Sequence, residues 1–410
     1  MRILYLNTTY FGGGAEQVTR QIYRGMKARG HEVFEIVCYN LRGEIGDPDV
    51  HVLYRSVPEK IFHRVQTYNR GNHNLTIPYA LHYICNFIRK NQIDAVHLHN
   101  PHDSFLGIRD IRTIAGVCPM VWTLHDFWAL TGHCASPYGC DDRWIYGCTS
   151  CEHLGNYPRL RRDVSAEQYR RKEKYLTGAG IRFTVPSEWM REQVAKSYLR
   201  GENCAVICNS LDIAMWNCPD KETIRKEYRL NTKKLVLAFV AADMAKPLKG
   251  MQLLADALDL LDSERFLLLT AGDSNREMQG LFERFETVSF GYLREQKKMN
   301  EFYALADVLV NPSVYETFGL VNIEAMASGT PVVAFRVCAM SEVVGEEAGW
   351  CVPEMTARAL AEKLTYLECH REELELKAKC ARAYVQKKFG QEHMLDQYEA
   401  LYRSVLVKNR

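Results

Sequence analysis

The sequence lacks any apolar run long enough to cross a bilayer. Its longest obvious run, Leu235–Ala242, falls far short of the ~18 residues that a membrane-spanning helix requires and predicts a buried strand instead. The first residues, Met1-Arg2-Ile3, lead straight into an apolar strand, with no signal-peptide pattern ahead of it. We therefore expect a cytoplasmic protein without membrane-spanning helices.

The chain also lacks a strong net charge and a dinucleotide fingerprint. Its formal charge of +2 disfavours a nucleic-acid-binding protein. No G-x-G-x-x-G occurs, which disfavours a dinucleotide-dependent oxidoreductase. The charge is nevertheless uneven, because residues 1–205 hold 26 Lys and Arg against 20 Asp and Glu. This excess predicts either an anionic partner, such as a membrane or a lipid phosphate, or ordinary scatter, and both readings stay open.

At 410 residues the chain is longer than one hydrophobic core usually supports, so two domains are expected. The alternation of apolar strands and amphipathic helices in both halves predicts an α/β fold. We expect a first domain over residues 1–212, a second over 213–390, and a final helix over 391–410 that packs back on the first domain. Residues 40–75 are polar, with short apolar pieces, and predict an irregular segment.

Several predicted strands end in residues suited to bind a ligand. Ile3–Leu6 leads to Gly12-Gly13-Gly14, Met120–Leu124 ends at His125, and Ala95–His99 ends in a His-rich loop that includes His102. In an open α/β sheet, ligands bind outside the carboxyl ends of the strands. We therefore predict a functional role for His125, and leave His99 and His102 open between functional and structural roles.

The second half carries the most specific pattern, Glu316–Ala334, which reads ETFGLVNIEAMASGTPVVA. It places two carboxylates, Glu316 and Glu324, where a strand passes into a helix. A helix N-terminus favours a bound phosphate, and nearby carboxylates suit the hydroxyls of a sugar. Solvated surface glutamates would explain one carboxylate but not the whole pattern.

This stretch resembles the glutamate-pair motif of the retaining glycosyltransferases of family 4, Glu-x-Phe-Gly-x-x-x-x-Glu-Ala-Met-Ala-x-Gly-x-Pro-Val. The glycine loop, the histidine loop around His125 and Lys249-Gly250 also resemble segments of that family. The resemblance implies a GT-B fold, in which two Rossmann-like domains face an interdomain cleft. The motif matches at Glu316, Phe318, Gly319, Glu324, Ala325, Met326, Ala327, Gly329, Pro331 and Val332.

The resemblance further implies transfer of a sugar from a nucleotide-diphosphate sugar (UDP or GDP) to a hydroxyl, with retention of configuration. The implied acceptor is a lipid-linked glycan or polysaccharide intermediate, as in bacterial polysaccharide biosynthesis, and no catalytic cofactor is implied. His125, Lys249 and Glu316 would be catalytic. Donor contacts would come from Gly13, Gly14, Lys246, Gly272, Tyr292, Phe318, Gly319, Leu320 and Glu324.

One departure from the family pattern lies in the loop Ala241–Gly250. Ala242 or Asp243 stands where the family carries an arginine that, with a lysine, clamps the donor diphosphate. Lys246 could replace that charge, although without the bidentate geometry of a guanidinium. The missing arginine keeps open a non-catalytic binding subunit of a polysaccharide assembly. An epimerase or phosphorylase on the same fold is a separate alternative.

A Cys-rich insertion, about residues 128–158, contains Cys134-x5-Cys140-x7-Cys148-x2-Cys151. Four thiolates at such spacing can hold a structural zinc, so we predict a zinc site here. Disulfides, which a cytoplasmic location disfavours, and reduced free thiols are the alternatives. The basic stretch that follows, residues 159–174, predicts either a solvated helix face or a contact with the acceptor or with the inner face of a membrane.

Overall fold

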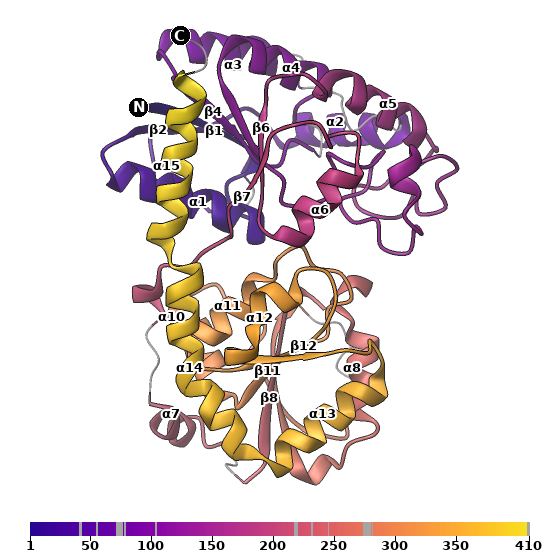
Figure 1. Cartoon of the computed structure of the whole chain (residues 1–410), viewed down its shortest axis with the longest axis vertical. Coiled ribbons are helices and arrows are strands. Elements are labelled where there is room, and N and C mark those ends of the chain that lie inside the picture. Colours follow the sequence, from indigo (N-terminus) through magenta and orange to yellow (C-terminus); the bar gives the residue numbers. More distant parts are fainter. Residues whose placement is uncertain are drawn as a thin grey trace. The chain divides into compact units, whose positions relative to one another are not determined.

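The computed structural model describes all residues except 41–42, 55, 71–76, 78, 103–104, 217–219, 231–232, 245, 274–279, 281 and 408–410. The chain forms two compact units (Figure 1). The first comprises Met1–Cys208 together with Met394–Arg410, and the second comprises Asn209–His393. Among the described residues, no helix combines the length and apolar character needed to cross a membrane.

The first unit is built on a parallel sheet with the strand order β3-β2-β1-β4-β5-β6-β7. The order reverses between β1 and β4, which is the switch point of a Rossmann-like sheet. Apolar residues such as Ile3, Leu4 and Leu6 are fully buried, as expected for strands covered on both faces. The strands are β1 (Arg2–Thr9), β2 (Glu32–Tyr39), β3 (Val50–Val52), β4 (Ala95–Leu98), β5 (Met120–Thr123), β6 (Arg182–Val185) and β7 (Cys204–Val206).

Helices connect these strands, and the last helix of the chain also belongs to this unit. In α15, Tyr402 hydrogen-bonds through its hydroxyl to His97 Nδ1 (2.7 Å), and Leu395 packs so closely on Gly25 that no Cβ would fit there. These contacts dock α15 on α1 and β4. The helices are α1 (Gly14–Ala28), α2 (Val57–Arg70), α3 (Ala80–Lys90), α4 (Ile108–Val117), α5 (Ser165–Leu176), α6 (Glu188–Lys196) and α15 (Gln391–Val407).

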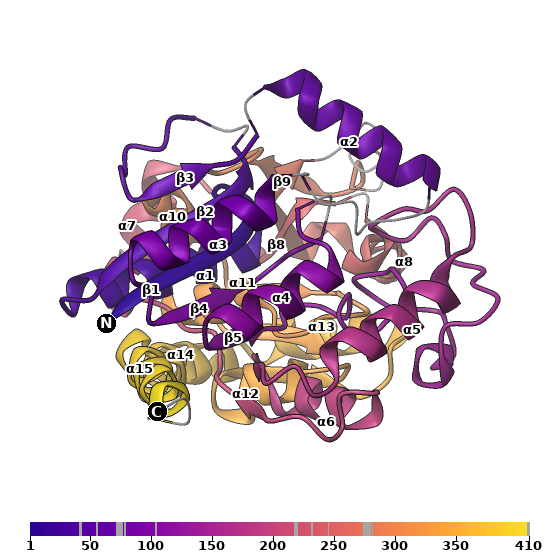
Figure 2. The ribbon, with the colours of Figure 1, turned by 90° about the horizontal axis from the view of Figure 1, so that it is seen from above.

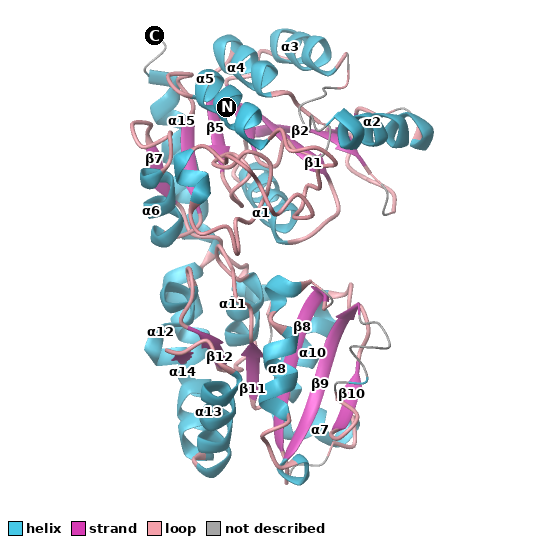
Figure 3. Cartoon of the chain, turned by 90° about the vertical axis from the view of Figure 1, so that its right-hand side faces the viewer, coloured by secondary structure: helices cyan, strands magenta, loops and turns pink. Residues whose placement is uncertain are grey.

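The second unit repeats the arrangement with a parallel sheet ordered β10-β9-β8-β11-β12-β13 (Figure 3). Its switch point lies between β8 and β11. The strands are β8 (Leu235–Asp243), β9 (Phe266–Asp273), β10 (Glu286–Ser289), β11 (Val308–Asn311), β12 (Val332–Phe335) and β13 (Gly349–Val352). The helices are α7 (Lys221–Glu227), α8 (Met251–Leu258), α10 (Gln296–Leu305), α11 (Leu320–Ala327), α12 (Met340–Ala348), α13 (Ala357–Cys369) and α14 (Arg371–Phe389).

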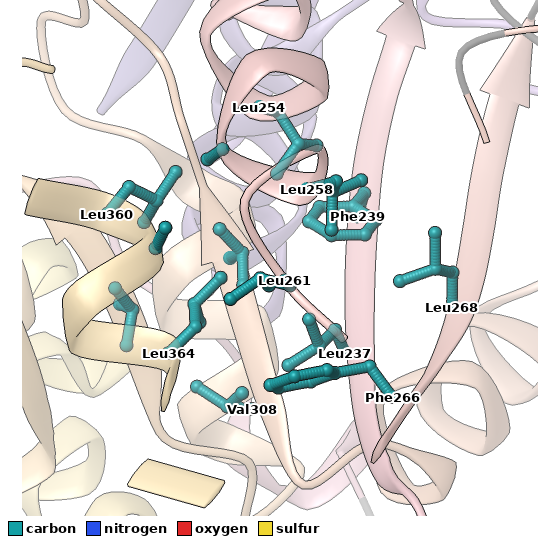
Figure 4. Close-up of a cluster of buried hydrophobic side chains, with 14 of the residues drawn as sticks. Leu237, Phe239, Leu254, Leu258, Leu261, Phe266, Leu268, Val308, Leu360 and Leu364 are labelled. Atoms are coloured by element: carbon teal, nitrogen blue, oxygen red, sulfur yellow. The ribbon is translucent and has the colours of Figure 1, made fainter. Parts of the chain in front are cut away.

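A hydrophobic cluster holds α8 and α13 against this sheet (Figure 4). Leu254 and Leu258 of α8 meet Leu360 and Leu364 of α13 over the apolar side chains of β8, and all four leucines are buried. The apolar residues of α13 recur at helical spacing, and the helix begins where Thr356 accepts a hydrogen bond from Ala359 N–H.

The predicted fold class is confirmed: the chain has two Rossmann-like units with parallel sheets. The prediction for residues 40–75 was wrong in part, because that segment contains β3 and the 14-residue helix α2. The predicted strand around Val288–Leu293 is shorter in the structure, where β10 ends at Ser289.

We expect Leu364→Ala to lower the free energy of unfolding by about 2–5 kcal/mol, because it leaves a cavity among fully buried side chains. Leu260→Ala is the matched control, since Leu260 is 61% exposed and its truncation should change stability by no more than about 0.5 kcal/mol. Urea denaturation of both variants measures the difference. Equal losses in the two would contradict the assigned core.

Candidate active site

The switch point of the second sheet brings two loops together. The loop after β8 contains the turn Pro247–Lys249, and the loop after β11 contains Glu316. Val314 N–H donates a hydrogen bond to Leu248 O (3.0 Å), which ties the loops to each other. Gly250 has φ +67°, and a Cβ there would lie 1.9 Å from Pro312 O, so only glycine permits this approach.

Lys249 and Glu316 meet across these loops. Lys249 Nζ lies 2.8 Å from Glu316 Oε2, and both side chains are partly buried. Gly319 (φ +86°) follows and caps the N-terminus of α11. A Cβ on Gly319 would crowd the side chains of Asn322, Met340 and Glu316. The site therefore combines the ammonium of Lys249 with the carboxylate of Glu316, which lies just before the N-terminus of α11 in the sequence.

The other motif residues are held more deeply. Glu324 is 7% exposed, and its Oε2 accepts a hydrogen bond from the Tyr303 hydroxyl (3.0 Å). Phe318 is 2% exposed and packs edge-to-face on Phe389. Its ring therefore supports the loop, and only its backbone could face a ligand. Leu320 is the first residue of α11.

The remaining predicted donor residues of this unit lie along the carboxyl ends of β8, β9 and β10. Gly272 N–H donates to Gly291 O (2.8 Å), and a Cβ on Gly272 would lie 1.7 Å from Ala241 O. Lys246 and Tyr292 are exposed. A cavity of about 240 Å³ opens beside these strand ends and is lined by Met244, Thr270, Phe282, Glu283, Phe285, Thr287 and Ser289.

In the first unit, the glycine loop follows β1 at the switch point. Gly13 and Gly14 are exposed, and Gly13 N–H donates to Glu16 Oε2 (2.7 Å) at the start of α1. A Cβ on Gly12 would lie 2.5 Å from the same oxygen. The loop is therefore closed onto the first turn of α1 by a carboxylate.

The histidines that follow β4 and β5 form a cluster. His99 Nδ1 and His125 Nε2 lie 2.9 Å apart, and His102 Nε2 lies 3.1 Å from Asp126 Oδ2. Burial would raise the pKa of Asp126, but His102 and the N–H of Trp128 hold that pKa below its ordinary value. The cluster encloses only about 10 Å³, which is room for about one water.

The histidine pair is neutral and has a defined proton arrangement. Burial lowers the pKa of His125 to about 4 and that of His99 well below its ordinary value. His99 Nε2 is buried without a hydrogen-bond partner among the described residues. A buried N–H without an acceptor costs more than a lone pair without a donor. We infer that His99 donates from Nδ1, so that His125 accepts at Nε2 and carries its proton on Nδ1.

The structure does not support the predicted zinc site. Among the described residues, no group of three or more His, Cys, Asp or Glu side chains is arranged to hold a metal ion, and Cys134, Cys140, Cys148 and Cys151 are free thiols. Two of the sulfurs lie against other partners: Cys148 Sγ accepts from Gly132 N–H (3.0 Å), and Cys151 Sγ lies 3.5 Å from His133 Nε2. Burial raises the pKa of the Cys134 thiol to about 12.

Two buried charged groups of the first unit have no counterpart in the sequence predictions. Lys172, in the stretch read as a basic face, is 1% exposed, donates to Thr131 O (2.9 Å) and lies over the ring of Trp128. Glu35 on β2 is 1% exposed, and its Oε2 has no hydrogen-bond partner among the described residues. The only sequence feature that could have indicated the burial of Glu35 is its position among the apolar residues of a predicted strand.

Two family models match the chain. Residues 12–214 match "Glycosyltransferase Family 4", and residues 234–369 match "Glycosyl transferases group 1". The first range covers most of the first unit and the second range covers the sheet with the ion pair. The two matched ranges therefore include the glycine loop and His125 in the first unit, and Lys249 and Glu316 in the second.

Curated relatives and solved structures agree with these matches. The chain is 27% identical over 279 residues (63% of this chain, 64% of the other) to the putative colanic acid biosynthesis glycosyl transferase WcaC of Escherichia coli. It is 29% identical over 190 residues (43% and 37%) to the sulfoquinovosyl transferase SQD2 of Arabidopsis thaliana. These matches span less than two thirds of either relative.

Among solved structures, sucrose-phosphate synthase from Thermosynechococcus elongatus superposes with a TM-score of 0.75 at 19% identity, over the full length of both chains. HepE from Anabaena, in complex with UDP-glucose, superposes with a TM-score of 0.68 at 17% identity, over 98% of this chain and 100% of the other. At these identities the likeness shows the fold alone.

The fold and the matches together define a glycosyltransferase of the GT-B fold. More narrowly, the chain belongs to the family 4 glycosyltransferases, with a family 4 first domain joined to a group 1 second domain.

We expect the stability of the protein to depend on pH through Glu35. Burial raises the pKa of Glu35 from 4.5 to about 8, Arg20 opposes this shift, and Glu16 adds to it. Between these pH values the folded chain keeps a proton that the unfolded chain has lost, so the free energy of unfolding falls as pH rises. Glu35→Gln should therefore gain stability relative to wild type between about pH 5 and about pH 9, by on the order of 3–5 kcal/mol.

Denaturant unfolding at both pH values measures this gain. Glu32→Gln is the matched control, because Glu32 lies on the same strand but is exposed and pairs with Arg2 at the surface. Its stability relative to wild type should change little with pH. A Glu35→Gln profile parallel to that of wild type would show that Glu35 titrates normally.

Proposed function

We propose that this glycosyltransferase transfers a sugar, with retention of configuration, from a nucleotide-diphosphate sugar to a hydroxyl of a lipid-linked glycan or polysaccharide intermediate. The observation that carries the proposal is the Lys249–Glu316 pair at the N-terminus of α11, on the switch point of the second sheet. The name of WcaC supports a role in polysaccharide biosynthesis, and the UDP-glucose bound by HepE supports a nucleotide-sugar donor.

The chemistry of the second unit fits departure of a diphosphate. As the bond to the sugar breaks, the diphosphate gains negative charge, and preorganised positive groups stabilise that charge. Lys249 supplies an ammonium, and α11 supplies the positive end of a helix dipole. In this proposal the diphosphate competes with Glu316 for Lys249, which leaves the Glu316 carboxylate to bind sugar hydroxyls.

With the diphosphate at Lys249 and the N-terminus of α11, the remaining donor contacts can be proposed. Glu324, already oriented by Tyr303, would accept hydrogen bonds from the ribose hydroxyls. We propose that the 240 Å³ cavity beside the ends of β9 and β10 receives the base, with the backbone near Gly272 and Tyr292 as a further contact. Lys246, exposed in the same loop as Lys249, would supply part of the charge that the missing arginine provides elsewhere in the family.

The first unit would carry the acceptor. Burial keeps His125 a neutral imidazole, which His99 orients through the contact at Nε2, and in this proposal its N–H donates to a sugar hydroxyl. Gly13 and Gly14 are exposed and carry no side chain, so we propose them as donor contacts through their backbone, with Glu16 releasing the Gly13 N–H. The proposed location is the cytoplasm, peripherally at the inner face of the membrane, where lipid-linked acceptors are found.

The donor can be identified by thermal shift with a panel of UDP-, GDP- and ADP-sugars. A donor that binds only the folded chain should raise the melting temperature, since binding stabilises the folded state by mass action. Incubation of that donor, radiolabelled in the sugar, with lipid-linked acceptors then tests for transfer. Label that appears in an epimerised nucleotide sugar or in a sugar phosphate, without any acceptor, would support the epimerase or phosphorylase alternative.

We expect Lys249→Met and Glu316→Gln each to lower kcat by about 10²–10³, because each removes a preorganised group from the reacting centre. Lys249→Met should also reduce the thermal shift by the donor. Lys297→Met and Glu347→Gln are matched controls at exposed positions of the same unit. Wild-type turnover in either site variant would rule out the assigned role of that residue.

A further inference from the structure

Helix α2 exposes its apolar residues and buries a charged one. Val57, Ile61, Phe62, Val65 and Tyr68 are between 46% and 59% exposed, whereas Lys60 is 8% exposed. At 3.6 residues per turn, all but Phe62 form one stripe along the helix, and Phe62 widens it. No other described helix exposes more than one large hydrophobic side chain.

The polar side of α2 is what attaches it to the first unit. Lys60 Nζ lies 3.0 Å from the centre of the Tyr39 ring, and the Tyr79 hydroxyl donates to Glu59 Oε1 (2.9 Å). His63 Nδ1 lies 3.1 Å from the Tyr54 hydroxyl. These contacts fix the rotation of the helix, so the apolar stripe faces outward. Figure 2 shows α2 at the periphery of its unit.

The composition of this face matches a bilayer surface. Aliphatic side chains flanked by Phe and Tyr are typical of helices that lie in the membrane interface. Arg64 is exposed at the border of the stripe, whereas Lys60 is buried and Glu59 is hydrogen-bonded to the Tyr79 hydroxyl. An exposed arginine beside an apolar stripe complements the anionic lipids of a cytoplasmic leaflet. A protein partner would not require this charge.

We propose that α2 is an interfacial helix that binds the first unit to an anionic lipid bilayer through Val57, Ile61, Phe62, Val65 and Tyr68. The choice of a lipid occupant rests in part on the proposed lipid-linked acceptor, whereas the outward apolar face stands on the geometry alone. The proposal assigns the membrane contact to α2 in place of residues 159–174, the basic stretch for which such a contact was one of the predictions. In that stretch Lys172 is buried and has a structural role.

Sedimentation with vesicles tests the proposal on the full-length protein. Wild type should bind vesicles of phosphatidylcholine with phosphatidylglycerol, and more weakly vesicles of phosphatidylcholine alone. I61E/F62E should lower the partition coefficient at least about tenfold, because two anchors become charged. Arg64→Glu should lower it roughly fivefold, and only on the anionic vesicles.

The control is Leu376→Glu, on α14 of the second unit, where Leu376 is 64% exposed. It should bind vesicles as wild type does. Absence of wild-type binding to anionic vesicles, retained binding by I61E/F62E, or an equal loss in Leu376→Glu would overturn the proposal. A lipid-free dimer that I61E/F62E dissociates would also overturn it, in favour of a second copy of the chain as the occupant.

Donor binding separates this inference from the proposed function. The thermal shift by the nucleotide sugar should be the same in I61E/F62E and in wild type, which also shows that the variant is folded. If no nucleotide sugar binds, the proposed function fails while vesicle binding remains a valid test of α2.

Discussion

The close approach of two loops at the switch point of the second sheet is the constraint on which the candidate site depends. Gly250 passes the carbonyl of Pro312 at a distance that excludes a side chain, and Val314 is hydrogen-bonded to Leu248. Lys249 is therefore held against Glu316 by backbone geometry rather than by the attraction of their charges alone. A partly exposed ion pair contributes little stability, and in the proposed function the pair instead preorganises the donor site.

In the first unit the candidate residues also lie at the switch point of the sheet, but they are glycines, a carboxylate and histidines rather than a lysine–glutamate pair. At its switch point the glycine loop meets the carboxylate of Glu16, and beside it the histidine cluster ends β4 and β5. Polar side chains continue inward from this cluster: His97 joins Thr123 to Tyr402, so the C-terminal helix α15 takes part in the same buried network. Such a network is stable only when its members are paired, which links the docking of α15 to the residues behind His125.

Much of the fold could be predicted, because it depends on local patterns. Apolar strands such as Leu235–Val240 alternate with amphipathic helices, and this order leaves few alternatives to two doubly wound sheets. The motif from Glu316 to Ala334 identified the loop and helix that carry the candidate site. The pairing of Lys249 with Glu316 could not be derived from their separation in sequence, because the strand order decides which loops become neighbours. Helix α2 was missed, although Val57, Ile61, Val65 and Tyr68 recur at helical spacing, and that spacing could not have shown that the apolar face is the exposed one.

The sequence by itself determined the fold class, the family and the loops that carry the proposed ligand-binding residues, since these depend on periodicity and on motifs of fixed spacing. Tertiary structure alone decided the environment of each side chain. It buried Lys172 and Glu35, paired His99 with His125, and left the four cysteines of the insertion without a metal-binding arrangement. The physical reason is that burial, charge and hydrogen-bond partners come from segments distant in the chain, and these set a side chain's protonation and reactivity.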